Sequence, residues 1–238
     1  ANPALNCRES PRRETDCLTI NGVLEKLVIL LLLVLSGSLM TWQMGVSGDV
    51  NQLHSATVMG CLAGFCVALA TICNPTMAWL LGPLYAVLEG LALGGISFIF
   101  EAQYPGIVLQ AFGCTMATAW SMLFLYRTGL VKVTESFTAG IVSATGGICV
   151  IYLGAIILQV FGIPVPFLRD ATPLGIAISV IISGVAAMNL ILDFDLVAKA
   201  ARDRVSKDYE WYASFGMVLT LVWLYLEILD LIRKIRSE

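Results

Sequence analysis

Three carboxylates stand inside apolar stretches of the sequence with no basic residue one helical turn away. They are Glu89, Asp193 and Glu227. A charged group at the centre of a bilayer costs on the order of 3 kcal/mol, so each acid needs a physical solution. It can share a proton with a second carboxylate, bind a cation such as Ca²⁺ through oxygen, or face a water-filled path. We take these acids as the candidate gate and ion-pathway residues. The alternative is a protonated acid that is hydrogen-bonded inside the bundle.

Three further polar residues form a secondary set. Asp195 has Lys199 four residues later, and Asp230 has Lys234 four residues later. Such pairs stabilise a helix modestly, and they suit the flanks of membrane spans near the lipid headgroups. Asn189 precedes the unpaired aspartate of the same stretch by one turn. We therefore treat Asp195, Asp230 and Asn189 as secondary site residues.

The composition predicts an integral membrane protein. Of 238 residues, 58% are hydrophobic and 13% are charged, and the mean hydropathy is +0.85. Soluble domains carry about 25% charged residues. The formal net charge of −3 gives no reason to expect a nucleic-acid partner. The seven cysteines form no CxxC motif and the only histidine is His54, so we expect no zinc or redox cofactor.

The elements that must position the acids are membrane-spanning helices, each of about 20 predominantly apolar residues. Residues 1–20 are polar, and residues 21–238 are predicted to form one transmembrane domain in an all-α bundle. Turn sequences, such as YPG at 104–106 and RTG at 127–129, separate the apolar runs. Glycines at four-residue spacing, such as Gly60 with Gly64 and Gly90 with Gly94, are expected to let helices pack closely. Seven spans are predicted, at about 24–44, 53–73, 79–100, 105–126, 138–161, 174–196 and 212–232.

The distribution of lysine and arginine predicts the orientation. In a seven-span arrangement, ten of the fourteen basic residues fall on the side of the N-terminus and four on the other side. Basic residues favour the cytoplasmic side, so the N-terminus is expected inside and the C-terminus outside. A re-entrant last segment, which would bring the basic C-terminus inside as well, is left open.

No arrangement of residues predicts an enzyme. A retinal protein needs a lysine inside its last span, and here Lys234 stands near the C-terminal end. The single histidine, His54, has no GxSxG nucleophile turn to serve, and the GxGD motif of intramembrane aspartyl proteases is absent. We therefore expect no catalytic residues.

Several stretches together resemble the Bax inhibitor-1 family (transmembrane Bax inhibitor motif proteins), and most closely its YccA-like bacterial-type branch. The resemblance covers nearly the whole chain, and the order and spacing of the motifs make it specific. It implies a seven-helix bundle in a bacterial inner membrane or in an organelle membrane of bacterial ancestry. The stretches are NPAL (2–5), PLYAVLEGLALGGIS (83–97), YPGIVLQA (104–111), YRTGLVKVTESFTAGIVSATGGI (126–148), MNLILDFD (188–195) and EWYASFGMVLTLVWLYLEILDLI (210–232).

The resemblance also implies a function. Members of the family are described as pH-sensitive Ca²⁺ leak channels, gated by a hydrogen-bonded pair of aspartates on the sixth and seventh helices. The sixth-helix aspartate matches Asp193 in LDFD, and the glutamine of that family motif falls on Asp195. The seventh-helix aspartate matches Glu227 in LYLE. The resemblance therefore implies a shared-proton pair of Asp193 and Glu227, with Ca²⁺ as the ion transported or bound there.

Two departures from the family pattern matter. Glu227 is one methylene longer than aspartate, so the geometry of any pair must differ. The arginine that latches onto the gate in some members has no counterpart, because residues 74–83 contain no base. Level pairing of Asp193 with Glu227 would also need a turn centred near Tyr209. The turn signals lie slightly earlier, at Ser206–Asp208, which predicts a mismatch of several ångströms at about 1.5 Å per residue.

Two other functions remain compatible with the sequence. The chain can be a non-transporting subunit that regulates or scaffolds a larger membrane complex, in which case membrane proteins are its partners beside the lipid bilayer. It can also be a proton-coupled exchanger, whose flux would depend on an opposing gradient. Ion flux measured with the purified protein separates these functions from a passive leak.

Overall fold

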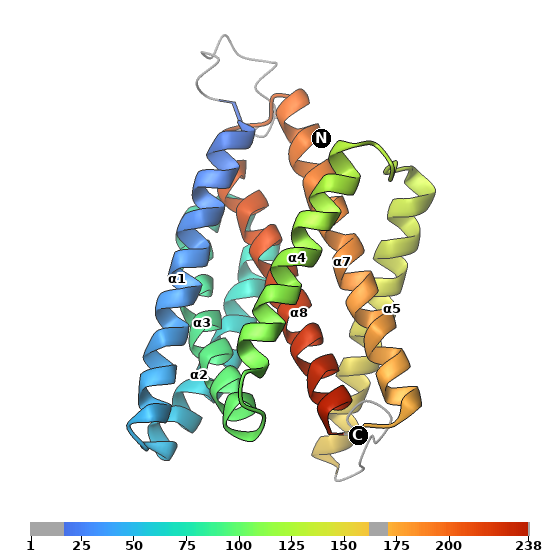
Figure 1. The fold of residues 1–238 in the computed structure, drawn as a ribbon. Coiled ribbons are helices and arrows are strands. Elements are labelled where there is room, and N and C mark those ends of the chain that lie inside the picture. Colours follow the sequence, from blue (N-terminus) through green and yellow to red (C-terminus); the bar gives the residue numbers. More distant parts are fainter. Residues whose placement is uncertain (1–16, 162–170, 238) are drawn as a thin grey trace. The chain divides into compact units, whose positions relative to one another are not determined.

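The computed structural model describes residues 17–161 and 171–237 (Figure 1). Within them, seven helices are long and apolar enough to cross a membrane, which confirms the seven predicted spans. The NPAL stretch, the arginines of residues 8–13, Arg169 and the predicted break at 163–166 lie outside the described residues. The elements are α1 (Ile20–Val46), α2 (Val50–Cys73), the 3-10 turn η4 (Pro75–Met77), α3 (Ala78–Gln103), α4 (Ile107–Arg127), α5 (Glu135–Val160), α7 (Pro173–Arg202) and α8 (Tyr209–Arg236).

The helix ends have local chemical causes. The Thr19 hydroxyl caps α1 by accepting a hydrogen bond from the Gly22 amide at 3.0 Å, and Thr134 caps α5 in the same way. The YPG corner turns through Gly106, whose φ of 82° lies in the left-handed region that glycine adopts without strain. The polar break before the last span is shorter than predicted. The helix α7 continues to Arg202, because Lys199 and Arg202 in its last turn suit the negative end of a helix.

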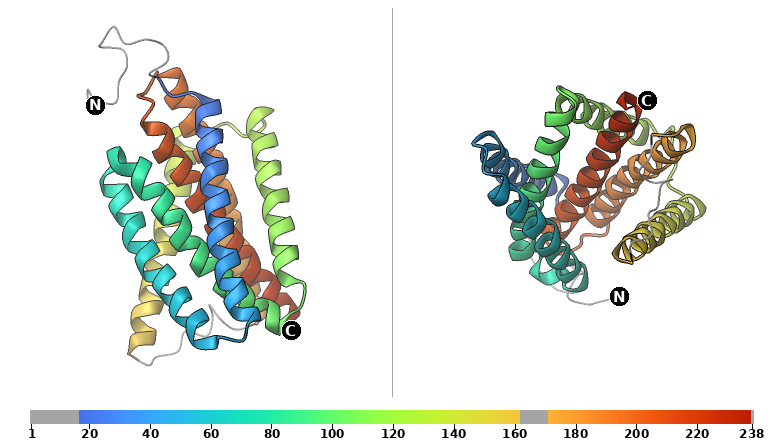
Figure 2. Two further views of the ribbon diagram at one scale, coloured as in Figure 1. Left: turned by 90° about the vertical axis from the view of Figure 1, so that its left-hand side faces the viewer. Right: turned by 90° about the horizontal axis from the view of Figure 1, so that it is seen from below.

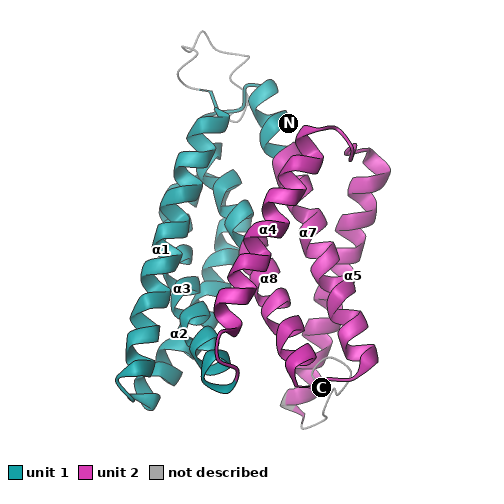
Figure 3. Ribbon diagram, viewed as in Figure 1, with its two compact units in different colours: residues 1–103, 196–219 teal, residues 104–195, 220–238 magenta. Residues whose placement is uncertain are grey.

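The chain divides into two compact units, which we describe separately (Figure 3). Unit 1 contains residues 1–103 and 196–219, and thus α1, α2, α3, the end of α7 and the start of α8. In unit 1, α2 and α3 form a hairpin through η4, and α1 packs along α3 (Figure 2). Unit 2 contains residues 104–195 and 220–238, and thus α4, α5, most of α7 and the second half of α8.

Glycines make the helix packing of unit 1 possible. A Cβ atom on Gly90 would lie 2.3 Å from the carbonyl oxygen of Val34, and one on Gly94 would lie 2.2 Å from that of Ser38. Both oxygens belong to α1. On the other side of α3, a Cβ atom on Gly60 of α2 would lie 2.7 Å from the Leu88 carbonyl oxygen. The expectation that these glycines bring helices together is confirmed.

We predict that Gly90→Ala lowers the free energy of unfolding by about 1–3 kcal/mol, because the added methyl group forces α1 away from α3. The matched control is Gly147→Ala on α5, where a Cβ meets nothing within 4 Å. That change should leave stability unchanged or slightly raised, since alanine favours helix. Denaturant unfolding in detergent measures both. Equal stability of the two variants would contradict the packing role.

Candidate functional site

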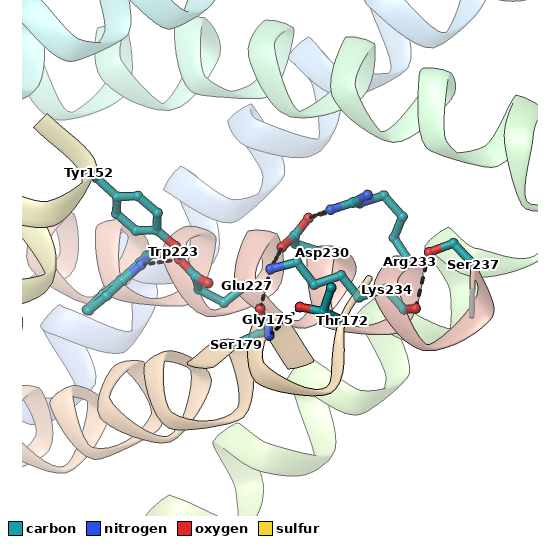
Figure 4. A network of polar contacts seen from close by, with 10 residues as sticks. All are labelled: Tyr152, Thr172, Gly175, Ser179, Trp223, Glu227, Asp230, Arg233, Lys234 and Ser237. Atoms are coloured by element: carbon teal, nitrogen blue, oxygen red, sulfur yellow. Dashed lines mark hydrogen bonds and ion pairs between the residues drawn. The ribbon is translucent and has the colours of Figure 1, made fainter. Parts of the chain in front are cut away.

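Five side chains with polar groups follow one face of α8 in unit 2. Their spacing of three, four, three and four residues places them in one line along the helix. The line begins near the middle of α8 and ends at its last turn. Figure 4 shows it from Trp223 to Lys234. We call this line the polar row; its members are Thr220, Trp223, Glu227, Asp230 and Lys234. Side chains from α5 and α7 complete it.

Glu227 is held by two donors. The Tyr152 hydroxyl of α5 donates to Glu227 Oε1 at 2.7 Å, and the Trp223 indole Nε1 donates to the same oxygen at 3.0 Å. The residue is only 6% exposed. Since an indole N–H can only donate, Oε1 must act as the acceptor. The carboxylate is therefore fixed in place between α5 and the preceding turn of α8 (Figure 4).

Asp193 reaches the polar row from α7. It forms a side-chain hydrogen bond with Thr220, the first member of the row. Its second oxygen, Oδ2, is buried and has no hydrogen-bond partner. Buried polar atoms are nearly always hydrogen-bonded, so this oxygen is an exception.

The structure does not bring Asp193 and Glu227 together as a pair. Asp193 meets Thr220, which precedes Glu227 by seven residues, or about 10 Å along a helix. The cause is the register of α7 and α8: the midpoint of residues 193 and 220 falls inside the connection between Arg202 and Tyr209. The mismatch inferred from the turn signals is therefore present. The expectation of one shared-proton pair is corrected to two acids at different levels of the polar row.

The end of the polar row is an ion-pair cluster. Asp230 pairs with Lys234 at 2.9 Å, as the four-residue spacing predicted, and with Arg233 at 2.6 Å. Lys234 also donates to Ser179 Oγ of α7 at 2.7 Å (Figure 4). The sequence suggested a lysine near the headgroups, yet Lys234 is buried, with 1% of its surface exposed.

The two secondary site residues of α7, Asp195 and Asn189, connect this helix to α4 and α5. The Tyr126 hydroxyl of α4 donates to Asp195 Oδ1 at 3.3 Å. Asn189 Nδ2 donates to Thr145 Oγ1 of α5 at 2.8 Å and to the Val185 carbonyl. Asp195 and Asn189 thus connect helices, while Asp193 meets the polar row.

Glu89 belongs to unit 1 and is described there by itself. It lies on the side of α3 that faces α2, where a Cβ on Gly64 would be 3.2 Å from its Oε2. Tyr85, one turn earlier, packs edge-on against Phe215 at 5.0 Å between ring centroids. No joint site with Asp193 or Glu227 is assigned to Glu89.

Sequence reasoning missed a buried ion pair in unit 1. Glu210, at the start of α8, is 0% exposed and pairs with Lys26 of α1. It also accepts hydrogen bonds from Thr19, from the amide at 2.9 Å and the hydroxyl at 3.2 Å. The sequence did carry a signal for this pair. Lys26 lies inside the first apolar span, and Glu210 lies just before the last span, at the end of the bundle where the first span begins.

The side chains of residues 17–161 and 171–237 do not form a prebuilt metal centre. Among the described residues, no three His, Cys, Asp or Glu side chains come close enough together to hold a metal ion. Ca²⁺ takes six to eight oxygen ligands. A Ca²⁺ ion shared between Asp193 and Glu227 does not fit their separation along the row.

Comparison with known proteins gives one match. A family model described as Bax inhibitor 1 like matches residues 2–237 of this chain. No curated protein and no solved structure matches it.

Proposed function

Since the chain belongs to the Bax inhibitor-1 family, we propose that it is a passive, pH-sensitive cation leak whose path follows the polar row of α8. The observation that carries the proposal is the row itself. Polar and charged side chains within a membrane span face protein or water rather than lipid. On α8 they form one line, which consists of Thr220, Glu227, Asp230 and Lys234. Ca²⁺ is the expected substrate, because carboxylate and hydroxyl oxygens suit it.

Two polar atoms of α7 support a hydrated path. Ser183 Oγ and Asp193 Oδ2 are buried and have no hydrogen-bond partner within the described part of the chain. Both belong to the helix that supplies Ser179 to the last member of the row. Water or a passing cation would provide the partner that the protein does not provide.

The proposed gate is Asp193 alone rather than a pair. When Asp193 is protonated, its hydrogen-bonded contact with Thr220 closes the interface between α7 and α8 at the first residue of the polar row. Ionisation leaves a buried charge on an oxygen without a donor. Opening the interface to water relieves that cost, so flux should rise as the pH rises.

The family branch, membrane and orientation are proposed as well. Membership of the YccA-like branch and residence in a bacterial inner membrane, or an organelle membrane of bacterial ancestry, follow from the resemblance. The basic residues favour the N-terminal end on the inner side. Protein partners in the membrane and the absence of catalysis and of resident cofactors remain predictions.

The test of transport is Ca²⁺ flux into proteoliposomes with Glu227→Gln. We expect this variant to lower flux severalfold, because an amide cannot carry the negative charge that would attract a cation to the middle of the row. Glu135→Gln is the matched control, since Glu135 lies exposed in the first turn of α5. It should behave as the unchanged protein.

An absence of Ca²⁺ flux from the unchanged, folded protein would overturn the leak. Stable co-purification in a large assembly would then favour the regulatory subunit. Flux that requires an opposing proton gradient would favour the exchanger instead.

A further inference from the structure

Lys234 is a buried cation at the end of the polar row. Lysine is almost never fully buried unless it is paired, and here two helices supply oxygen atoms to its ammonium group. Asp230 Oδ2 lies at 2.9 Å and Ser179 Oγ at 2.7 Å. The ammonium thus has oxygen ligands of the kind that a small metal cation would use.

The charges around Lys234 balance one another. Arg233 already pairs with Asp230 through the other carboxylate oxygen, from Nε at 3.0 Å and Nη2 at 2.6 Å. Lys234 therefore adds a second positive charge, and Glu227 stands two turns earlier on the same face of α8. With Glu227 and Asp230 ionised, the four residues are neutral together. Without Lys234, the group would carry a net negative charge.

We propose that Lys234 is a tethered counter-ion that fills a cation subsite at the end of the polar row. The subsite consists of Ser179 Oγ, Asp230 Oδ2 and the negative charge of Glu227. A cation that enters the row from this end must displace the ammonium group. The ligand that would replace the ammonium group is a small metal cation that binds oxygen atoms, and Ca²⁺ is the probe used to test it.

The first test is Ca²⁺ binding by Lys234→Met, which keeps most of the side-chain volume and removes the charge. Thermal unfolding in detergent is followed against Ca²⁺ at constant ionic strength in N-methyl-D-glucamine chloride. We expect saturable stabilisation of this variant, with a midpoint at least about tenfold lower in Ca²⁺ concentration than for the unchanged protein. The gain follows from the negative charge that the ammonium no longer balances.

Arg233→Met is the matched control. It removes a positive charge from the same aspartate, but one that is more exposed than Lys234. It leaves the Lys234 ammonium on Asp230 Oδ2 and Ser179 Oγ, so its midpoint in Ca²⁺ concentration should fall much less than that of Lys234→Met. The proposal is overturned if Lys234→Met shows no gain, or if Arg233→Met shows the same gain, since a general surface-charge effect would then suffice.

A second measurement uses the unchanged protein. It tests the proposal even if the Lys234→Met variant does not fold. Acetylation of Lys234 by an amine-reactive ester is quantified by mass spectrometry as Ca²⁺ is raised. Displacement of the ammonium should increase labelling of Lys234 severalfold and leave the exposed Lys132 unchanged. Labelling of Lys234 that does not respond to Ca²⁺ would overturn the proposal.

The subsite rests on the proposed function only for its place in a transport path. Both measurements report binding and neither requires flux. Ca²⁺ binding without any flux would uphold the subsite and overturn the leak. Flux without a Ca²⁺ response at Lys234 would uphold the leak and overturn the subsite.

Discussion

Asp193→Asn is expected to abolish the dependence of Ca²⁺ flux on pH. The unchanged protein should leak more as the pH rises, because ionisation puts a charge on a buried oxygen that has no donor. One titrating group changes its charged fraction by at most about tenfold per pH unit, which bounds the steepness. Asparagine keeps the shape of the side chain and cannot ionise. The variant should therefore show the low flux of the acidic state at every pH.

The measurement is Ca²⁺ entry into proteoliposomes from mildly acidic to mildly alkaline pH. Asp203→Asn is the matched control, because Asp203 is exposed in the connection that follows α7. It should preserve the rise in flux. A pH profile of Asp193→Asn that coincides with that of the unchanged protein would remove Asp193 from the gate.

Glu210→Gln is expected to cause the largest loss of stability, about 3–5 kcal/mol. Removing one partner of a buried ion pair leaves the other charge without compensation. Here the charge left behind is Lys26, and Thr19 also loses an acceptor that served its amide and its hydroxyl. Glu210 also packs tightly against α1, because a Cβ on Gly22 would lie 2.3 Å from its Oε1. Denaturant unfolding in detergent measures the loss.

A double-mutant cycle separates the ion pair from general damage at this helix end. Glu210→Gln combined with Lys26→Met should recover part of the loss, because no unpaired charge remains. Glu25→Gln, on an exposed neighbour of Lys26, should change stability little. A Glu210→Gln variant within about 1 kcal/mol of the unchanged protein would contradict the assigned role.

The helices could be predicted from the sequence because hydropathy and turn chemistry are local properties. Span length follows from membrane thickness, and a corner such as YPG marks its own position through Gly106. The α7 end was predicted less well, since Lys199 and Arg202 look like loop residues by composition but stabilise a helix terminus.

The candidate site could be predicted in its residues but not in its contacts. Asp193 and Glu227 were identifiable as acids without local bases. Their partners, Thr220 and Tyr152, depend on the register between helices, which no local pattern encodes. A difference of seven residues along α8 decides whether two acids share a proton or act separately. The buried Lys234 was missed for a related reason: its depth depends on Ser179 of another helix.

The contacts of α5 have a consequence for the order of assembly in the membrane. Among the described residues of this helix only Ile141 is buried, and Thr145 and Tyr152 make its hydrogen bonds to α7 and α8. Both partner helices are synthesised after α5. During synthesis, α5 is therefore complete before either of these polar partners exists. The hydrogen bonds of Thr145 and Tyr152, each worth about 1 kcal/mol, can then form only once α7 and α8 have followed.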